Sequence, residues 1–206
     1  VDMVEKLSEY VADTLQYFTL HMLGNHFRYE HRYPAEFELF KPVMGTSFSY
    51  AGVNEDNKDK LVNAYDNCVL YLDYFMNKLI TYVDSLNRSA VIVYISDHGE
   101  SFWDDERKLS LHGSYELSKY EFHVPMLVWY SDEYASKNLD KVARMKNNVT
   151  KTISSDVIFY SLLDIAGIEE VVDSTKSFSS TYLQPIDSLW VLDGRGEKSN
   201  VSIRKF

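Results

Sequence analysis

Val91-Ile-Val-Tyr-Ile-Ser-Asp97-His98-Gly99-Glu100-Ser101 is the stretch that decides the fold of this chain. Its first five residues are β-branched or aromatic and do not alternate with polar residues, which is typical of a strand covered on both faces. The strand ends abruptly in an acid, an imidazole and a glycine. Because open α/β sheets bind their ligands just beyond the carboxyl ends of strands, the sequence predicts a functional site here.

Asp97 and His98 offer an oxygen and a nitrogen ligand, a pairing that suits zinc or a similar divalent ion. Gly99 allows the tight turn that lets neighbouring side chains converge. In the competing interpretation, Asp97 caps a turn and His98 is an ordinary polar loop residue. The buried strand before the pair and the glycine after it favour a metal site with Asp97 and His98 as ligands.

The composition is that of an acidic globular protein. The 206 residues are enough for one sizeable core, and 45% of them are hydrophobic. The net charge of −10 argues against a nucleic-acid partner, which needs clustered Lys and Arg. The single cysteine, Cys68, excludes a disulfide within the chain and is expected in the core. No apolar run approaches the roughly 20 residues of a membrane span.

Helical and strand patterns alternate along the chain. The spacing of apolar residues predicts helices over 3–15, 54–86 and 154–166, and strands over 16–20, 90–96 and 124–130. Residues 131–150 are interpreted as polar surface, and those beyond 193 as a loose tail. This order predicts an α/β fold with a mostly parallel sheet, in a single domain over 1–206. Three strands make a thin sheet, so we expect the fold to be incomplete in this chain.

The histidines are the second signal for a metal centre. His21, His26 and His98 follow predicted strand ends, and His112 lies in the long loop after the central strand. In a parallel sheet these positions share one edge, where a metal site can be assembled from separate strands. The spacing fits neither a zinc finger nor an H-E-x-x-H helix, so a closed structural site is not expected. His26 and His112 are the better candidates, whereas His21 is equally well explained as a core histidine.

Several segments of the sequence occur together in a characteristic order. They are His21-Met-Leu-Gly-Asn-His26 with Arg32-Tyr33-Pro34, Tyr65-Asp66-Asn67 with Tyr71-Leu72-Asp73, Ser96-Asp97-His98-Gly99-Glu100-Ser101, Leu111-His112-Gly113, His123-Val124-Pro125, and Ser155-Asp156 with Leu162-Leu163-Asp164-Ile165-Ala166-Gly167. Over about residues 16–168 this set resembles the C-terminal part of the catalytic domain of bacterial phosphoethanolamine transferases. These enzymes belong, beside the sulfatases, to the alkaline-phosphatase-like superfamily.

The resemblance implies an α/β/α sandwich and a zinc-dependent reaction. In the family, phosphoethanolamine passes from phosphatidylethanolamine to a lipid A or lipopolysaccharide-core acceptor. The resemblance further implies that Asp97 and His98 bind zinc. It implies that His26, His112 and, less directly, His21 contact the transferred phosphate or a second zinc. The family's threonine nucleophile and a glutamate ligand lie upstream, so no nucleophile is assigned here and the isolated stretch is expected to be inactive.

The resemblance also implies a location. Members sit in the inner membrane of Gram-negative bacteria with the catalytic domain in the periplasm. The membrane segments are expected outside this stretch, which by itself is expected to be soluble. Phe27-Arg28 replaces the Gly-Pro of many members and leaves the acceptor open.

Two alternatives remain. One keeps the fold and changes the reaction to that of a sulfatase, phosphodiesterase or phosphoglycerol transferase. The other is a non-catalytic sulfatase-like module that binds no metal.

Overall fold

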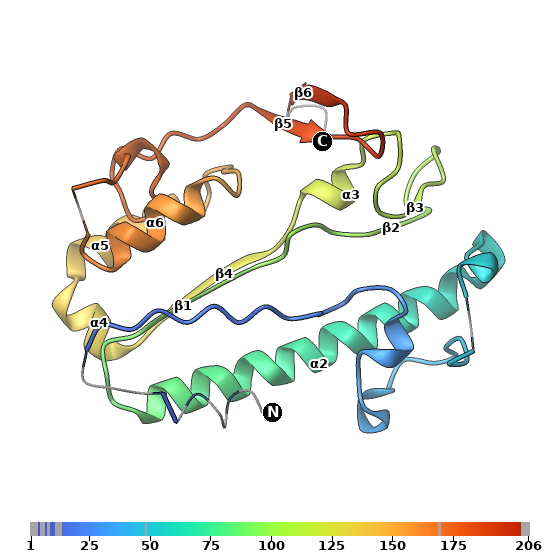
Figure 1. Cartoon of the computed structure of the whole chain (residues 1–206), viewed down its shortest axis with the longest axis horizontal. Helices are drawn as coiled ribbons and strands as arrows, with labels where there is room; N and C mark the ends of the chain where they lie inside the picture. Colours follow the sequence, from blue (N-terminus) through green and yellow to red (C-terminus); the bar gives the residue numbers. More distant parts are fainter. Residues whose placement is uncertain are drawn as a thin grey trace. The chain divides into compact units, whose positions relative to one another are not determined.

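The structure is a computed structural model that describes residues 4, 7, 9, 10, 14–47, 49–168 and 170–202 (Figure 1). The chain divides into two units. The first comprises Val1–Ser85, Asp97–Ser114 and Tyr120–Val124, and the second Leu86–Ser96, Tyr115–Lys119 and Pro125–Phe206. Most of the predicted helix over 3–15 lies outside the described residues. A single domain over 1–206 stays a prediction.

The first unit is built along one long helix, α2 (Lys58–Ser85), which confirms the helix predicted over 54–86. The short helix η4 (Glu55–Asn57) precedes it, and the Asn54 side chain accepts a hydrogen bond from the Asn57 backbone N–H, as a cap should. The apolar stripe of α2 is buried at Leu61, Ala64, Cys68, Phe75 and Leu79. No helix among the described residues is both long and apolar enough to cross a membrane.

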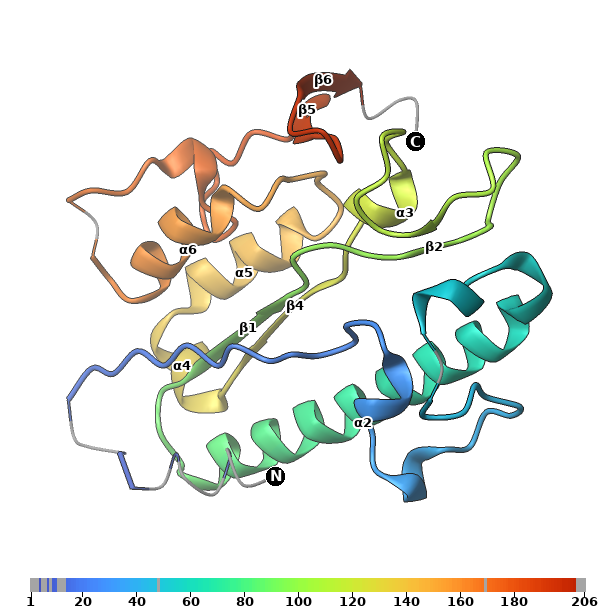
Figure 2. The same ribbon diagram turned by 45° about the vertical axis from the view of Figure 1, so that its right-hand side comes forward.

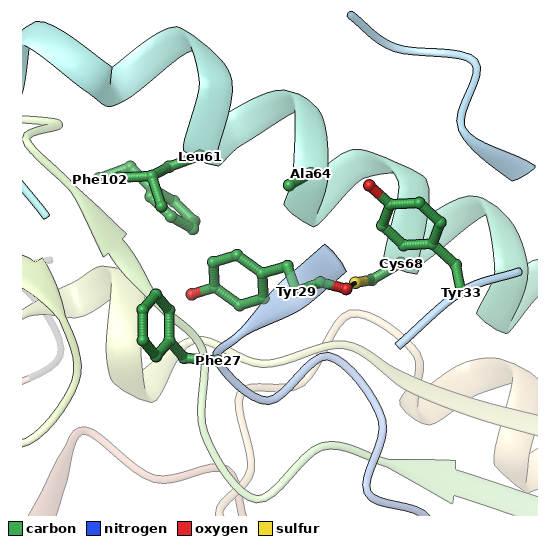
Figure 3. Packing of buried hydrophobic residues seen from close by; sticks show 7 residues of the cluster. All are labelled: Phe27, Tyr29, Tyr33, Leu61, Ala64, Cys68 and Phe102. Carbon is green, nitrogen blue, oxygen red and sulfur yellow. Dashed lines mark hydrogen bonds between the residues drawn. The ribbon is translucent and has the colours of Figure 1, made fainter. Parts of the chain in front are cut away.

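Further short helices lie before α2 in the described part of the chain: η1 (Tyr29–His31), η2 (Ala35–Phe37) and η3 (Tyr50–Gly52). Phe27 and Tyr29 from this region pack with Cys68 and Phe102 in the core of the first unit (Figure 3). The Cys68 thiol donates to the Tyr29 carbonyl at 3.3 Å, which confirms its predicted core position. Buried Asn67 accepts from the backbone N–H groups of Leu39 and Phe40, both at 2.9 Å. The loop that carries the first histidines is thereby fastened to α2.

The second unit holds β1 (Val91–Ile95) and β4 (Met126–Tyr130), both close to their predicted positions. Its helices are α4 (Asp132–Lys137), α5 (Leu139–Asn148) and α6 (Val157–Ile165), and α5 and α6 lie beside one another in both views (Figures 1 and 2). The core of this unit joins the helices to the C-terminal segment through Tyr134, Val142, Met145, Val157, Phe178 and Leu183. The helix predicted up to 166 is confirmed, and Gly167 ends it with a φ of +77°.

The predicted parallel arrangement is wrong for the strands that the structure describes. β1 and β4 are antiparallel, with Val91 opposite Tyr130 and Ile95 opposite Met126. The other pairs, β2 (Ser101–Phe102) with β3 (Ser110–Leu111) and β5 (Ser188–Leu192) with β6 (Lys198–Ser202), are antiparallel too. The reason is the connection between β1 and β4. It contains a hairpin and the one-turn helix α3 (Lys119–Phe122) instead of a crossover helix, so the chain re-enters at the end where it left.

Three further predictions need correction. Residues 16–20 form no strand, because they have no ladder partner in the described part of the chain and most of their side chains are exposed. The polar stretch 131–150 is helical: α4 is capped by the Ser131 side chain, and α5 buries Val142 and Met145 on one face. The tail beyond 193 is not loose: it forms β6, which pairs with β5. The Asp193 carboxylate and carbonyl accept hydrogen bonds that hold the tight turn between the two strands.

Candidate metal centre

The end of β1 delivers the candidate ligands through a close backbone contact at Gly99. The Gly99 N–H donates to the Glu121 carbonyl at 2.8 Å. A Cβ atom at position 99 would lie 2.1 Å from the Tyr120 carbonyl oxygen, so only glycine fits. Glycine is therefore required by the close approach of α3, and the side chains on either side of it are fixed in direction.

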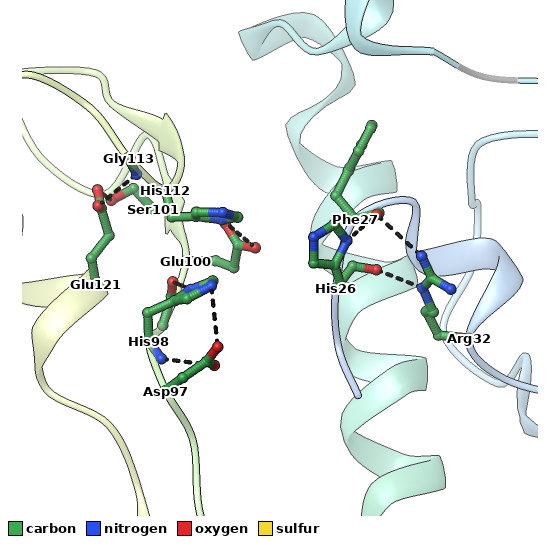
Figure 4. Close-up of polar contacts among 11 residues, drawn as sticks. His26, Phe27, Arg32, Asp97, His98, Glu100, Ser101, His112, Gly113 and Glu121 are labelled. Atoms are coloured by element: carbon green, nitrogen blue, oxygen red, sulfur yellow. Dashed lines mark hydrogen bonds and ion pairs between the residues drawn. The ribbon is translucent and has the colours of Figure 1, made fainter. Parts of the chain in front are cut away.

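His98, Glu100 and His112 form a group that could hold a metal ion. One ligand atom from each lies within 4.8 Å of the others (Figure 4). The ring centroids of His98 and His112 are 3.9 Å apart, and His112 Nδ1 is 3.1 Å from Glu100 Oε1. Two imidazoles and a carboxylate are a donor set that suits zinc. The predicted residues His98 and His112 are thus brought together, with Glu100 between them.

Asp97 turns toward His98. Its Oδ2 atom lies 3.9 Å from His98 Nε2, and its side chain is 89% exposed. His98 Nδ1 is 2.9 Å from the Gly99 carbonyl, an acceptor that places the proton on Nδ1. Nε2 is then the ligand atom of this imidazole, the usual arrangement for a metal-binding histidine held by a carbonyl. Asp97 is therefore a neighbour of His98 but not a member of the group formed by His98, Glu100 and His112, and its role as a ligand stays a prediction.

Glu100 is a deeply buried acid of the site. Its side chain is 3% exposed. Its Oε2 atom is buried and makes no close hydrogen bond with the described residues, although the Tyr29 hydroxyl faces this carboxylate. Burial raises the pKa of Glu100 to about 7, against the opposing effect of nearby His98. A buried carboxylate oxygen without a close hydrogen bond is costly, and a cation at this position would satisfy it. The residues present therefore fit a divalent cation.

Glu121 supports the loop that carries His112. It is 6% exposed, and its carboxylate accepts hydrogen bonds from Ser101 Oγ at 3.2 Å and from the Gly113 N–H at 3.0 Å. One side chain thus ties α3 to β2 and to the residue after His112. The sequence gives neither Glu100 nor Glu121 a role, although Glu100 stands in the segment that begins with Asp97-His98-Gly99, because an acid in a polar stretch is expected to be solvated.

The remaining predicted histidines lie differently. The His26 ring centroid is 6.2 Å from that of His112, close to the group but not part of it. The backbone of His26 is fixed by Arg32, whose Nε donates to the His26 carbonyl at 2.9 Å and whose Nη2 donates to the Phe27 carbonyl at 3.3 Å. His21 is exposed and is not a member of the group.

The chain belongs to the sulfatase family, whose family model matches residues 1–168. Among curated relatives, it is 33% identical over 176 residues to phosphoethanolamine transferase EptA of Salmonella typhimurium, a match that covers 82% of this chain. The chain spans 29% of the length of that relative.

Solved structures share the fold. The soluble domain of lipooligosaccharide phosphoethanolamine transferase A from Neisseria meningitidis matches with a TM-score of 0.66 and 28% identity, over 77% of this chain and 48% of that one. The C-terminal periplasmic domain of EptC from Escherichia coli, in complex with zinc, matches with a TM-score of 0.70 and 23% identity, over 87% and 49% of the two chains. These neighbours confirm the predicted sulfatase-type α/β fold.

Proposed function

We propose that the protein containing this chain is a zinc-dependent phosphoethanolamine transferase, with phosphatidylethanolamine as donor and lipid A or the lipopolysaccharide core as acceptor. The observation that carries the proposal is the group of His98, Glu100 and His112 beside Asp97, just after β1. The named activity of the curated relative and the zinc complex of an EptC domain support it. As in the structural neighbours that are periplasmic domains, we place the catalytic domain in the periplasm, anchored to the inner membrane by other parts of the protein.

Asp97 and His98 are the proposed zinc ligands, with Glu100 as a further carboxylate at the same position. A bound zinc ion would lower the pKa of a hydroxyl nucleophile and stabilise charge on the phosphoryl oxygens. The nucleophile is proposed to come from a part of the protein outside this chain. The Gly99 carbonyl keeps His98 in the tautomer that binds through Nε2.

His26 and His112 are the proposed contacts for the transferred phosphate or for a second zinc ion. The contact between His112 Nδ1 and Glu100 Oε1 fixes the direction of this ring, and Arg32 fixes the backbone beneath His26. Both histidines are exposed, so a phosphoryl group can approach them from solvent. An imidazole N–H that donates to a phosphoryl oxygen stabilises negative charge developing on it. His21 would take part only if other segments of the protein bring it closer.

The test compares matched aspartate substitutions in the full-length protein. Asp97→Asn and His98→Ala are expected to lower transfer of phosphoethanolamine by about a hundredfold or more and to reduce bound zinc. Asp84→Asn, an exposed acid near the end of α2, should change neither. Undiminished transfer by Asp97→Asn and His98→Ala would refute the ligand assignment. Release of sulfate or of a phosphodiester product without transfer would favour another reaction of the family.

A further inference from the structure

A pocket in the first unit lies outside the metal group. It has a volume of about 480 Å³ and is lined by Phe27, Arg28, His31, Arg32, Ser49 and Tyr50. None of these residues belongs to the group formed by His98, Glu100 and His112. The volume is in the range of small-molecule sites, so the pocket is large enough for one sugar ring with its substituents.

The pocket is basic although the chain is acidic. Two arginines and a histidine line it, while the net charge of the chain is −10. Arg32 is held in place because its guanidinium donates to the carbonyls of His26 and Phe27. A guanidinium has more N–H groups than these two bonds use, and the remaining ones can face a ligand. Arginine pairs recognise phosphate and carboxylate oxygens, so the pocket favours an anionic group.

The other walls suit a hydroxylated ring. His31 Nε2 lies 3.2 Å from the Thr46 carbonyl, and because a carbonyl only accepts, Nε2 donates there and Nδ1 is left for a hydroxyl. Ser49 adds a hydroxyl that can donate or accept. Tyr50 is 64% exposed and packs its ring against Phe27, with 4.4 Å between centroids. An exposed aromatic face can cover the apolar C–H face of a sugar while its hydroxyl stays in water.

We propose that this pocket binds an anionic sugar, either phosphorylated or carboxylated, and holds it as part of the acceptor. The acceptor role rests on the proposed transferase function, whereas the binding itself does not. The position supports the role, because Phe27 of the pocket follows His26 directly, and Arg32 bonds to both of their carbonyls. Arg28 and Arg32 would hold the charged group, and Tyr50 would cover the ring.

The experiment measures equilibrium binding of soluble probes to the full-length protein by calorimetry. The probes are glucose 1-phosphate, glucuronate, neutral glucose and inorganic phosphate. Glucose 1-phosphate or glucuronate should bind saturably and about tenfold more tightly than glucose, because charge-assisted hydrogen bonds to arginine are lost with the neutral sugar. Whichever of these two probes binds more tightly shows whether the pocket prefers a phosphate or a carboxylate. Inorganic phosphate should bind about tenfold more weakly than glucose 1-phosphate, because it lacks the ring that Tyr50 covers.

Variants locate the binding. Arg28→Gln and Tyr50→Ala should each weaken binding of the anionic sugar by about tenfold. Both residues are exposed, so folding is not expected to depend on them. Lys41→Gln removes the same charge from an exposed position outside the pocket and should change binding less than twofold. If Arg28→Gln and Lys41→Gln weakened binding of the anionic sugar equally, the proposal that it binds in this pocket would be overturned. The absence of saturable binding would overturn it as well.

His98→Ala separates this inference from the proposed function. If the pocket is the sugar site, His98→Ala binds the anionic sugar as tightly as the unchanged protein even when transfer is lost. Loss of sugar binding in His98→Ala would place the sugar at the metal group and overturn the inference. If no transferase activity is found but Arg28→Gln still weakens binding, the sugar site stands and the proposed function fails.

Discussion

At the scale of single residues, the site depends on two positions that hold backbone in place. At Gly99, α3 approaches the backbone so closely that a Cβ atom added at this position would lie only 2.1 Å from the Tyr120 carbonyl oxygen. Glu121 accepts from the Gly113 N–H and from Ser101. Both act before any ligand is bound, and both determine where His98 and His112 point.

Gly99→Ala is expected to destabilise the complete protein by about 1–3 kcal/mol, because the added methyl group forces the backbone at α3 to move. Zinc binding should weaken as well, since His98 and Glu100 flank the displaced residue. Thermal unfolding and metal titration measure the two effects. Gly45→Ala is the matched control: nothing lies within 4 Å of its Cβ position, and stability should stay unchanged or rise slightly. A stable Gly99→Ala variant with unaltered zinc affinity would contradict the role of the contact.

Glu121→Ala leaves the Gly113 N–H and the Ser101 hydroxyl without this acceptor, at an expected cost of about 1–3 kcal/mol in stability. Glu121→Gln retains one carbonyl oxygen and should cost less. If Glu121 positions the loop, its replacement should also lower transfer without lowering the zinc content. Stability curves, zinc content and transfer rates of the two variants decide this. Equal losses in both variants would mean that the charge, and not the loop bonds, matters.

At the scale of elements, α2 is held to the loop before it by one buried amide. Asn67 accepts from the N–H groups of Leu39 and Phe40 and donates to the Phe40 carbonyl at 3.0 Å. Asn67→Ala should therefore cost about 2–4 kcal/mol of the free energy of unfolding, since several backbone groups lose their partner. Asn63→Ala removes a single bond to the Pro42 carbonyl from the same helix and should cost about 1 kcal/mol. Denaturant unfolding of the two variants tests the difference.

In the second unit, α6 is joined to the segment after it by a partly buried acid. Burial of Asp164 opposes its charge, but hydrogen bonds from Ser177 and Ser179, both at 2.6 Å, and Lys141 outweigh burial and lower the pKa of Asp164. A lowered folded-state pKa adds stability above the unfolded pKa of about 3.9, and this stability is lost as the pH falls through the folded value.

Melting temperatures between pH 7 and pH 3 test this linkage. The unchanged protein should lose stability as the carboxylate is protonated, whereas Asp164→Asn should start lower and lose less over the same range. Asp140→Asn, an exposed acid on α5, should follow the curve of the unchanged protein. If the melting temperatures of Asp164→Asn and of the unchanged protein fell in parallel with pH, Asp164 would not be the cause of the loss of stability.

At the scale of the whole molecule, the sequence predicts elements better than their arrangement. The positions of α2, β1, β4 and α6 follow from hydrophobic spacing and caps, which are local. The direction of β4 does not, because an unbroken apolar run reads the same in either orientation and only the connection decides it. The β5–β6 hairpin is missed because its strands alternate weakly, although Asp193-Gly-Arg-Gly is a turn signal.

The site shows the same division. The ligand chemistry of Asp97 and His98 is visible in the sequence. The structure brings His98 beside His112, whereas Asp97 lies next to His98 and is not a member of the group. The roles of Glu100 and Glu121 depend on burial, which arises only when α3 folds over Gly99. Sequence patterns indicate which side chains could bind a cation, whereas tertiary contacts decide which acids are buried away from solvent.

Zinc should therefore stabilise the folded protein as a whole, because the unfolded chain does not hold the candidate ligands together. A ligand that binds only the native state at about 100 times its Kd adds about 2.7 kcal/mol. Thermal unfolding of the full-length protein, followed by tryptophan fluorescence, should shift upward with added zinc and downward with a chelator. His98→Ala should abolish the shift, and Asp84→Asn should preserve it. A zinc-dependent shift that persists in His98→Ala would show that the ion binds elsewhere and that the residues after β1 do not form the metal centre.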